Sequence, residues 1–134
     1  MDSWVSAVRH DGDSLPAQTF ATLHSFGGAD GGNPGGLVQA TDGNFYGTTE
    51  LGGANFCILN GLFTNGCGTI FKITPTGTLT TLYSFCAQNG TECTDGYYPN
   101  AGLVRATDGN FYGTTALGGA NGGGTVFKVT PAAR

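Results

Sequence analysis

Short runs of alternating apolar and polar residues, separated by glycine-rich turns, recur along the chain and predict β-strands. The Asp-Gly step of Thr41-Asp42-Gly43-Asn44 is typical of a hairpin turn, and Pro75-Thr76-Gly77 predicts a second turn. The expected strands are Thr19–Phe26, Gly36–Ala40, Phe45–Thr49, Thr69–Thr74, Leu79–Phe85, Leu103–Ala106, Phe111–Thr115 and Thr125–Thr130. The pattern therefore predicts an all-β protein built from antiparallel hairpins.

Three stretches of the chain occur twice, which indicates that one structural unit is duplicated. GLVQATDGNFYGTT recurs as GLVRATDGNFYGTT, GTIFKITP recurs as GTVFKVTP, and LHSF recurs as LYSF. The matched pairs are Gly36–Thr49 with Gly102–Thr115, Gly68–Pro75 with Gly124–Pro131, and Leu23–Phe26 with Leu82–Phe85. We expect an irregular leader over 1–18, followed by units at about 19–78 and 79–131 in one repeat domain, 19–134.

Each unit is expected to supply four strands, A to D, as a propeller blade does. The strand order along the chain is D, A-B-C-D, A-B-C, so a lone D-type strand precedes the first unit and the second unit lacks its own. Strand C carries Phe71 and Ile73 on one side and Ile70 on the other. Apolar residues on both faces are what a sheet packed between neighbouring sheets needs. The fold class is therefore two four-stranded antiparallel blades of propeller type.

The repeated motifs resemble a known family. The YGTT of Tyr46–Thr49, the GTIFK of Gly68–Lys72 and the LYSF of Leu82–Phe85 are similar to the GloVer tandem repeat of large secreted or surface-anchored bacterial proteins. The resemblance extends over roughly Thr19 to Pro131. It implies a propeller-like fold and an extracellular setting, and it implies no catalytic residues.

Two blades by themselves leave apolar faces and open strand edges in water. We therefore expect the ring to be completed by oligomerisation, with Thr19–Phe26 of one copy completing the sheet that Leu103–Thr130 forms in a neighbour. A trimer with six blades is favoured over a dimer or tetramer, and a rotation that does not close gives a filament. The alternative is that the chain is a stretch of a longer propeller.

Composition narrows the function classes. Of 134 residues 25 are glycine, only 10% are charged, and the net charge is −4. A nucleic-acid reader needs clustered Lys and Arg, and a helical bundle does not tolerate this much glycine. No apolar run is long enough for a membrane span, and Met1–His10 lacks the apolar core of a signal peptide. Nucleic-acid partners and a membrane span are therefore not expected.

The four cysteines lie in two long loops. Local pairs Cys57–Cys67 and Cys86–Cys93 are the natural disulfides, while a zinc site of four thiolates is the less favoured reading because no C-x-x-C spacing occurs. Disulfides favour an extracellular or cell-surface location. Asn89-Gly90-Thr91 matches a glycosylation sequon, which matters only in a eukaryotic host.

Loop length varies only between strands B and C and between strands D and A, and in a blade these loops share one face. Aromatic planes beside amides and carboxylates suit sugar rings, so a glycan is the ligand class that this face favours. The candidate ligand-binding residues are Phe56, Phe63, Tyr97, Tyr98, Asn89, Asp95 and Asp30. The opposing interpretation is that the loops on this face have no function and that their sequences vary freely for that reason.

Catalysis has little support in the sequence. His24 aligns with Tyr83 on a strand and is interpreted as a packing residue, and the Asp residues of the TDGN turns are explained by turn chemistry. No catalytic residue, cofactor or metal ligand is expected. The leading hypothesis is a non-catalytic, self-assembling extracellular module that binds a glycan. The alternatives are a purely structural surface or filament subunit and, third, a propeller enzyme of the lyase or hydrolase type.

Overall fold

The computed structural model describes residues 17–59, 61–88 and 93–131, with backbone alone at 59 and 63–65. The described chain is all-β and contains no helix. The strands are β1 (Gly32–Gln39), β2 (Phe45–Leu51), β3 (Phe56–Leu59), β4 (Leu62–Asn65), β5 (Thr69–Ile73), β6 (Leu79–Ser84), β7 (Val104–Arg105), β8 (Phe111–Thr115) and β9 (Thr125–Val129). No helix suited to crossing a membrane occurs among the described residues.

The two sequence repeats form two separate antiparallel sheets. The first has the strand order β1-β2-β5-β6, and the second has the order β7-β8-β9. Equivalent strands pair in the same register, because Tyr46 faces Lys72 in the first sheet and Tyr112 faces Lys128 in the second. The predicted A, B, C and D strands of the first unit and the A, B and C strands of the second are thereby confirmed. The two sheets do not close into a barrel or ring.

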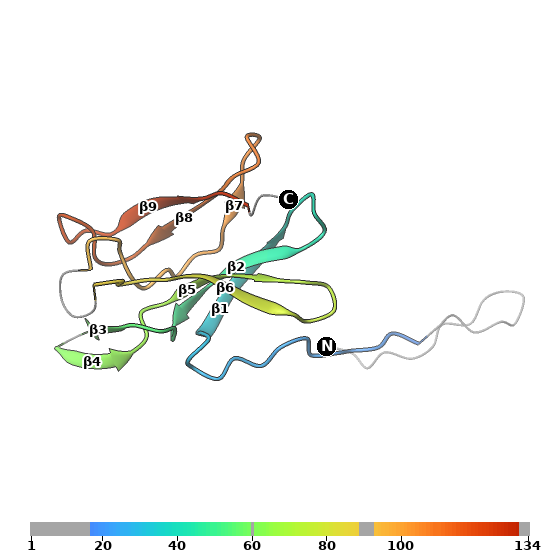
Figure 1. Cartoon of the computed structure of the whole chain (residues 1–134), viewed down its shortest axis with the longest axis horizontal. Helices are drawn as coiled ribbons and strands as arrows, with labels where there is room; N and C mark the ends of the chain where they lie inside the picture. Colours follow the sequence, from blue (N-terminus) through green and yellow to red (C-terminus); the bar gives the residue numbers. More distant parts are fainter. Residues whose placement is uncertain (1–16, 60, 89–92, 132–134) are drawn as a thin grey trace, which may run out of the picture.

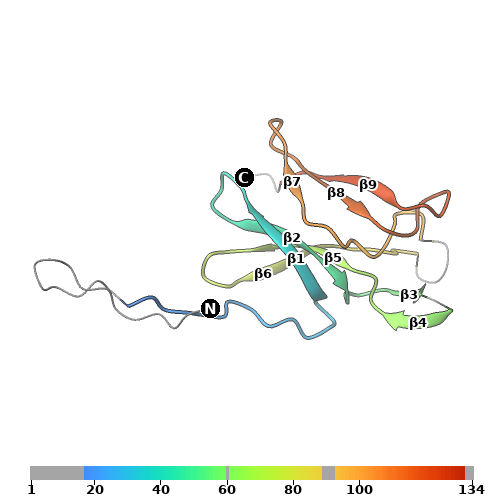
Figure 2. The same cartoon turned by 180° about the vertical axis from the view of Figure 1, so that it is seen from behind.

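The segment Thr19–Phe26, which was predicted to pair with a second copy, forms no strand in the single chain. This segment pairs with no strand in the described chain. It lies below the first sheet, whereas the second sheet lies above it (Figures 1 and 2). The first sheet thus separates the segment from β9 of the same chain, whereas the expected pairing is with the corresponding sheet of a neighbouring copy.

A small hairpin, β3-β4, extends the connection between β2 and β5 and was not predicted. Gly61, between the two strands, has a φ of 79°, and the sequence at this point reads Asn-Gly. An Asn-Gly pair between apolar residues is a strong hairpin signal, because the tight turn requires positive φ. The sequence therefore carried this signal within the long loop.

The turns and the loops lie at opposite ends of the sheets (Figure 1). The β1-β2, β5-β6 and β7-β8 turns share one end, while β3-β4, the β6-β7 connection and the β8-β9 loop share the other. Disulfides Cys57–Cys67 and Cys86–Cys93 form at this second end, with Cα separations of 5.8 and 4.5 Å. Both predicted pairings are present, and the variable loops gather at one end as expected.

The core lies between the two sheets. Tyr46 of β2 and Phe111 of β8 are fully buried, and their rings stack with centroids 4.5 Å apart. Phe85, directly after β6, packs edge-on against Phe127 of β9 at 5.3 Å. Thr48 adds a polar contact across the interface, because its hydroxyl donates to the Ala101 carbonyl at 3.1 Å. Sheet stacking, with strand pairing confined to each sheet, therefore joins the units.

Candidate binding surfaces

Asp95, a predicted ligand residue, ties down the connection that follows β6. Its Oδ2 accepts the Tyr83 hydroxyl at 2.5 Å and the Ala87 N–H at 3.1 Å. Burial, reinforced by the neighbouring carboxylate, raises the pKa of Tyr83 to about 12. The carboxylate that was expected to contact a ligand therefore holds strand β6 to its loop.

Asp30 lies in the connection before the first sheet, as Asp95 lies in the connection before the second sheet. Its Oδ1 accepts the Gly27 N–H at 2.9 Å, and its Oδ2 lies 2.7 Å from His24 Nε2. The Gly27 hydrogen bond is the main cause that lowers the pKa of Asp30, and His24 adds to it. Asp30 and Asp95 thus perform the same structural task in the two units, which the sequence analysis did not recognise.

Tyr97 and Tyr98 anchor the loops to one another. The Tyr97 hydroxyl donates to the Ile58 carbonyl at 3.2 Å and so fastens β3 to the β6-β7 connection. The Tyr98 N–H donates to the Cys67 carbonyl at 2.8 Å, in a backbone with a φ of 66°. Both side chains are half-buried. Phe56, in contrast, is exposed on β3.

The predicted ligand residues come from three different connections of the chain. Phe56, Tyr97, Tyr98 and Asp95 lie in the β2-β5 and β6-β7 connections. Asp30 lies in the connection in front of β1, which reaches the same end through the hydrogen bond from the Gly53 N–H to the Gly28 carbonyl. Asn89 and the side chain of Phe63 lie outside the described residues. Of the five predicted residues whose side chains are described, Asp30, Asp95 and Tyr97 make anchoring hydrogen bonds within the chain, and Phe56 is exposed.

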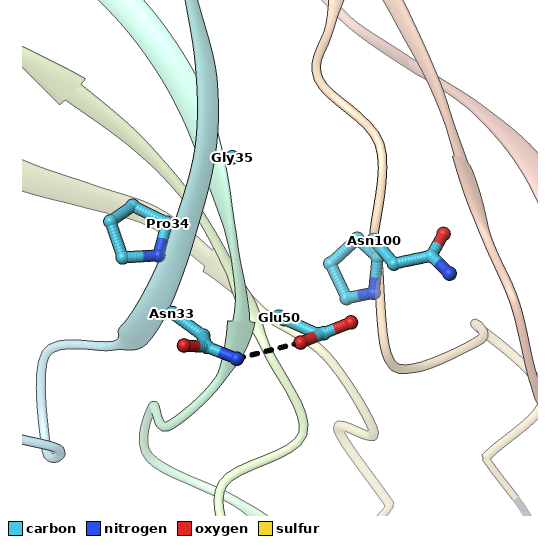
Figure 3. A pocket seen from close by; sticks show the side chains of 6 residues that line it. Asn33, Pro34, Gly35, Glu50 and Asn100 are labelled. Atoms are coloured by element: carbon cyan, nitrogen blue, oxygen red, sulfur yellow. Dashed lines mark hydrogen bonds between the residues drawn. The ribbon is translucent and has the colours of Figure 1, made fainter.

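A polar cleft of about 250 Å³ opens between the two units at the loop end (Figure 3). Its walls are Asn33, Pro34, Gly35, Glu50, Pro99 and Asn100. The Asn33 amide donates to Glu50 Oε1 at 2.8 Å, and the Asn100 amide stands on the opposite wall. The sequence did not predict this cleft, because its residues come from β1, β2 and the β6-β7 connection, which only sheet stacking brings together.

Each unit has two distinct sheet faces. We name them after the two adjacent aromatic residues of the FYGTT strand, because the phenylalanine and the tyrosine point to opposite faces. The phenylalanine face comprises Leu37, Phe45, Phe71 and Ile73 in the first unit and Leu103, Phe111, Phe127 and Val129 in the second. The tyrosine face comprises Val38, Tyr46, Thr48 and Ile70 in the first unit and Val104, Tyr112, Thr114 and Val126 in the second. The core forms where the tyrosine face of the first unit meets the phenylalanine face of the second.

One copy of each face therefore remains uncovered by a sheet. On the phenylalanine face of the first unit, Leu37 is 57% exposed, while its counterpart Leu103 is 8% exposed. On the tyrosine face of the second unit, Val126 is 79% exposed, while its counterpart Ile70 is 3% exposed. The molecule thus leaves parts of both faces exposed at opposite ends of the stack. On the phenylalanine face of the first unit the exposed part lies around Leu37, because Phe71 is 2% exposed and packs against Phe26.

Both free faces are hollowed. The phenylalanine face of the first unit contains an apolar groove of about 350 Å³, whose walls include Phe45, Phe71 and the N-terminal residues Leu23 and Phe26. The tyrosine face of the second unit contains a hollow of about 290 Å³ beside Tyr112 and Val126.

The described residues contain no group of three or more His, Cys, Asp or Glu side chains close enough to hold a metal. Comparison with curated proteins and with solved structures found no match to this chain. The model of the Gloeobacter/Verrucomicrobia repeat matches residues 14–134, which include both units and both free faces. A match over nearly the whole chain establishes that this protein belongs to the Gloeobacter/Verrucomicrobia repeat family.

Proposed function

We propose that this protein is a non-catalytic extracellular repeat module that assembles head to tail through blade-like stacking of its sheets. The observation that carries the proposal is the pair of free faces, each of which has a buried counterpart in the same molecule. Since the strands of the two units carry nearly the same residues, the phenylalanine face of one copy can pack on the tyrosine face of another, as the two units pack within the molecule. The two disulfides favour an oxidising, extracellular setting.

The internal interface specifies the contacts expected between copies. Tyr112 of one copy takes the place of Tyr46 and stacks on Phe45 of the next, as Tyr46 stacks on Phe111. Thr114 takes the place of Thr48, whose hydroxyl reaches the Ala101 carbonyl in the molecule. Because different faces meet, the contact is heterologous, and it closes into a ring or continues as a filament. A trimer then has six blades, within the usual range for propellers.

The test uses one lysine on each free face. Val126→Lys places a charge on the tyrosine face, and Leu37→Lys places one on the phenylalanine face. Burying an unpaired charge is costly, so each variant should lose self-association, measured by light scattering, by about tenfold or more. Val126 is largely exposed in the isolated chain, so Val126→Lys should leave the chain folded.

Mixing the two variants distinguishes head-to-tail packing from other contacts. The Leu37→Lys chain keeps its tyrosine face and the Val126→Lys chain keeps its phenylalanine face, so an equimolar mixture should form a one-to-one dimer and stop there. Thr107→Lys, an exposed turn position, is the matched control and should assemble as the unmodified protein does. A wild-type chain that stays monomeric at all concentrations, or variants that assemble normally, would contradict the proposal.

The cleft of Figure 3 supports glycan binding as a second candidate function. The Glu50 carboxylate and the amides of Asn33 and Asn100 provide acceptors and donors for sugar hydroxyls, and two proline rings line the same cleft. Carboxylate and amide groups in a cleft between rigid sheets are the combination that favours a sugar over an apolar ligand.

This candidate is tested with a panel of neutral oligosaccharides. If one binds, Glu50→Gln and Asn100→Ala should each weaken it by about tenfold, whereas Asn121→Ala in the exposed β8-β9 loop should have no effect. Absence of binding to the whole panel at millimolar concentration, or equal binding by all three variants, would contradict a glycan site in this cleft.

A further inference from the structure

We infer that residues Phe20–Ser25 are held ready as the fourth strand of a sheet whose other three strands, β7-β8-β9, come from a second copy of this chain. The inference deepens the proposed head-to-tail assembly and rests on it. It adds a second mode of contact, because strand pairing then joins the same two copies that face stacking joins. Three features of the structure support it.

The first feature is the aromatic packing of the N-terminal segment. Phe26 meets Phe71 at a centroid distance of 5.3 Å and an interplanar angle of 64°. Phe85, which follows β6, meets Phe127 at 5.3 Å and 61°. Phe71 and Phe127 are counterparts in the two units, so Phe26 sits against the first unit as the fourth strand of a preceding blade would. The segment therefore already holds the position of a blade strand without pairing to a sheet.

The second feature is the attachment of the segment to the loop that follows it. His24 packs edge-on against Phe26 and reaches Asp30, and Tyr83 packs edge-on against Phe85 and reaches Asp95. The backbone repeats the match: the Gly53 N–H donates to the Gly28 carbonyl at 2.9 Å, and the Gly119 N–H donates to the Cys93 carbonyl at 2.9 Å. The contacts that anchor the segment to the following loop thus recur in both units, although the connection is longer in the second unit and contains the Cys86–Cys93 disulfide.

The third feature is the strand that lacks a partner. β9 pairs only with β8 among the described strands, whereas its counterpart β5 pairs with both β2 and β6. Transfer of the β5-β6 register predicts the pairs between copies, which are Thr125 with Ser25, Val126 with His24, Phe127 with Thr22, Lys128 with Ala21, and Val129 with Phe20. Phe20, which is 93% exposed in the single chain, then lies opposite Val129.

Cross-linking tests the register directly. Ala21→Cys and Lys128→Cys are made in separate chains, one with a size-shifting tag, and the mixture is oxidised mildly with oxidised glutathione. Non-reducing electrophoresis should show a mixed dimer, because these positions are expected to face each other across the strands. The control pairs Gln18→Cys with Lys128→Cys, three residues out of register, which places the thiols about 10 Å apart and should give little product.

Proline substitutions test whether backbone hydrogen bonds form. Successive N–H groups of a strand point to opposite edges, so only one of Ala21→Pro and Thr22→Pro removes a bond to the second copy. That variant should weaken association by about tenfold, while the other variant and the control Ala17→Pro should assemble normally. The alternation identifies a strand, since general disruption of the segment would affect both positions alike.

The outcomes separate this inference from the proposed function. Association that depends on Val126 and Leu37, with no in-register cross-link and no effect of either proline, would overturn strand donation and leave face stacking intact. No association at all would overturn both. An in-register cross-link accompanied by a response to only one proline would support strand donation.

Discussion

At the scale of single residues, the polar groups near the loops serve the fold. Asp30 and Asp95 each fix a loop by accepting a backbone N–H and by contacting the side chain of His24 or Tyr83 in the segment before that loop. The sequence repeat contains this information, because Asp-Gly occurs at both Asp30-Gly31 and Asp95-Gly96. A residue that recurs at the same place in both units favours a structural role over a role in one ligand site.

The Tyr83–Asp95 contact predicts a dependence of stability on alkaline pH. Folding raises the pKa of Tyr83 from its ordinary value of 10.0 to about 12, so the folded state favours the protonated phenol. Its contribution is complete below pH 10 and is lost as the pH rises from about 10 towards 12. Urea denaturation across this range should therefore show a falling free energy of unfolding.

Tyr83→Phe is the control for this prediction. It removes the titrating phenol, so the free energy of unfolding should fall less steeply above pH 10 than in the unmodified protein. Tyr112 also has a raised pKa, through its hydrogen bond to Asp108, and it titrates in both proteins. Equal slopes in the two proteins would show that the Tyr83–Asp95 contact does not contribute to the pH dependence.

At the scale of strands, the paired strand explains why the YGTT motif contains a glycine. Gly47 faces Phe71 and Gly113 faces Phe127 across the B and C strands, so in each unit a phenylalanine ring lies over a glycine. A Cβ added at Gly113 would stand 2.5 Å from Phe127 Cζ, closer than real side chains approach. The glycine thus makes room for the ring that builds the phenylalanine face.

Gly113→Ala tests this role. The added methyl group should displace the Phe127 ring from Phe85 and lower the free energy of unfolding by about 1–3 kcal/mol. Gly123→Ala is the matched control, because a Cβ there meets nothing within 4 Å, and it should have little effect. Thermal or urea denaturation measures both variants, and equal stability would show that the ring adapts to the methyl group without loss.

At the scale of the whole molecule, the two units are alike in sequence and unlike in environment. Tyr46 is fully buried while Tyr112 is half-buried, and Phe111 is fully buried while Phe45 is half-buried. The difference follows from position in the stack, since each sheet has a neighbouring sheet on one side only. Two predictions therefore belong to this scale. The mixture of the Val126→Lys and Leu37→Lys chains should form a one-to-one dimer, and Ala21→Cys should cross-link to Lys128→Cys of a second copy.

The sequence by itself determined the repeat, the seven strands of the two units and both disulfide pairs. These depend on alternation, turn residues and short loops, which are local properties of the chain. The Asn60-Gly61 step also marked the β3-β4 hairpin, although the length of its loop concealed it. Local signals of this kind need no knowledge of what lies beside them.

Only the tertiary structure decided which face of each sheet is buried, where Thr19–Phe26 lies, and that Asn33, Glu50 and Asn100 share a cleft. Two units with the same residues cannot reveal from sequence which of their equal faces will meet. That choice follows from the path of the β6-β7 connection, which places the second sheet on one side of the first and leaves the N-terminal segment on the other.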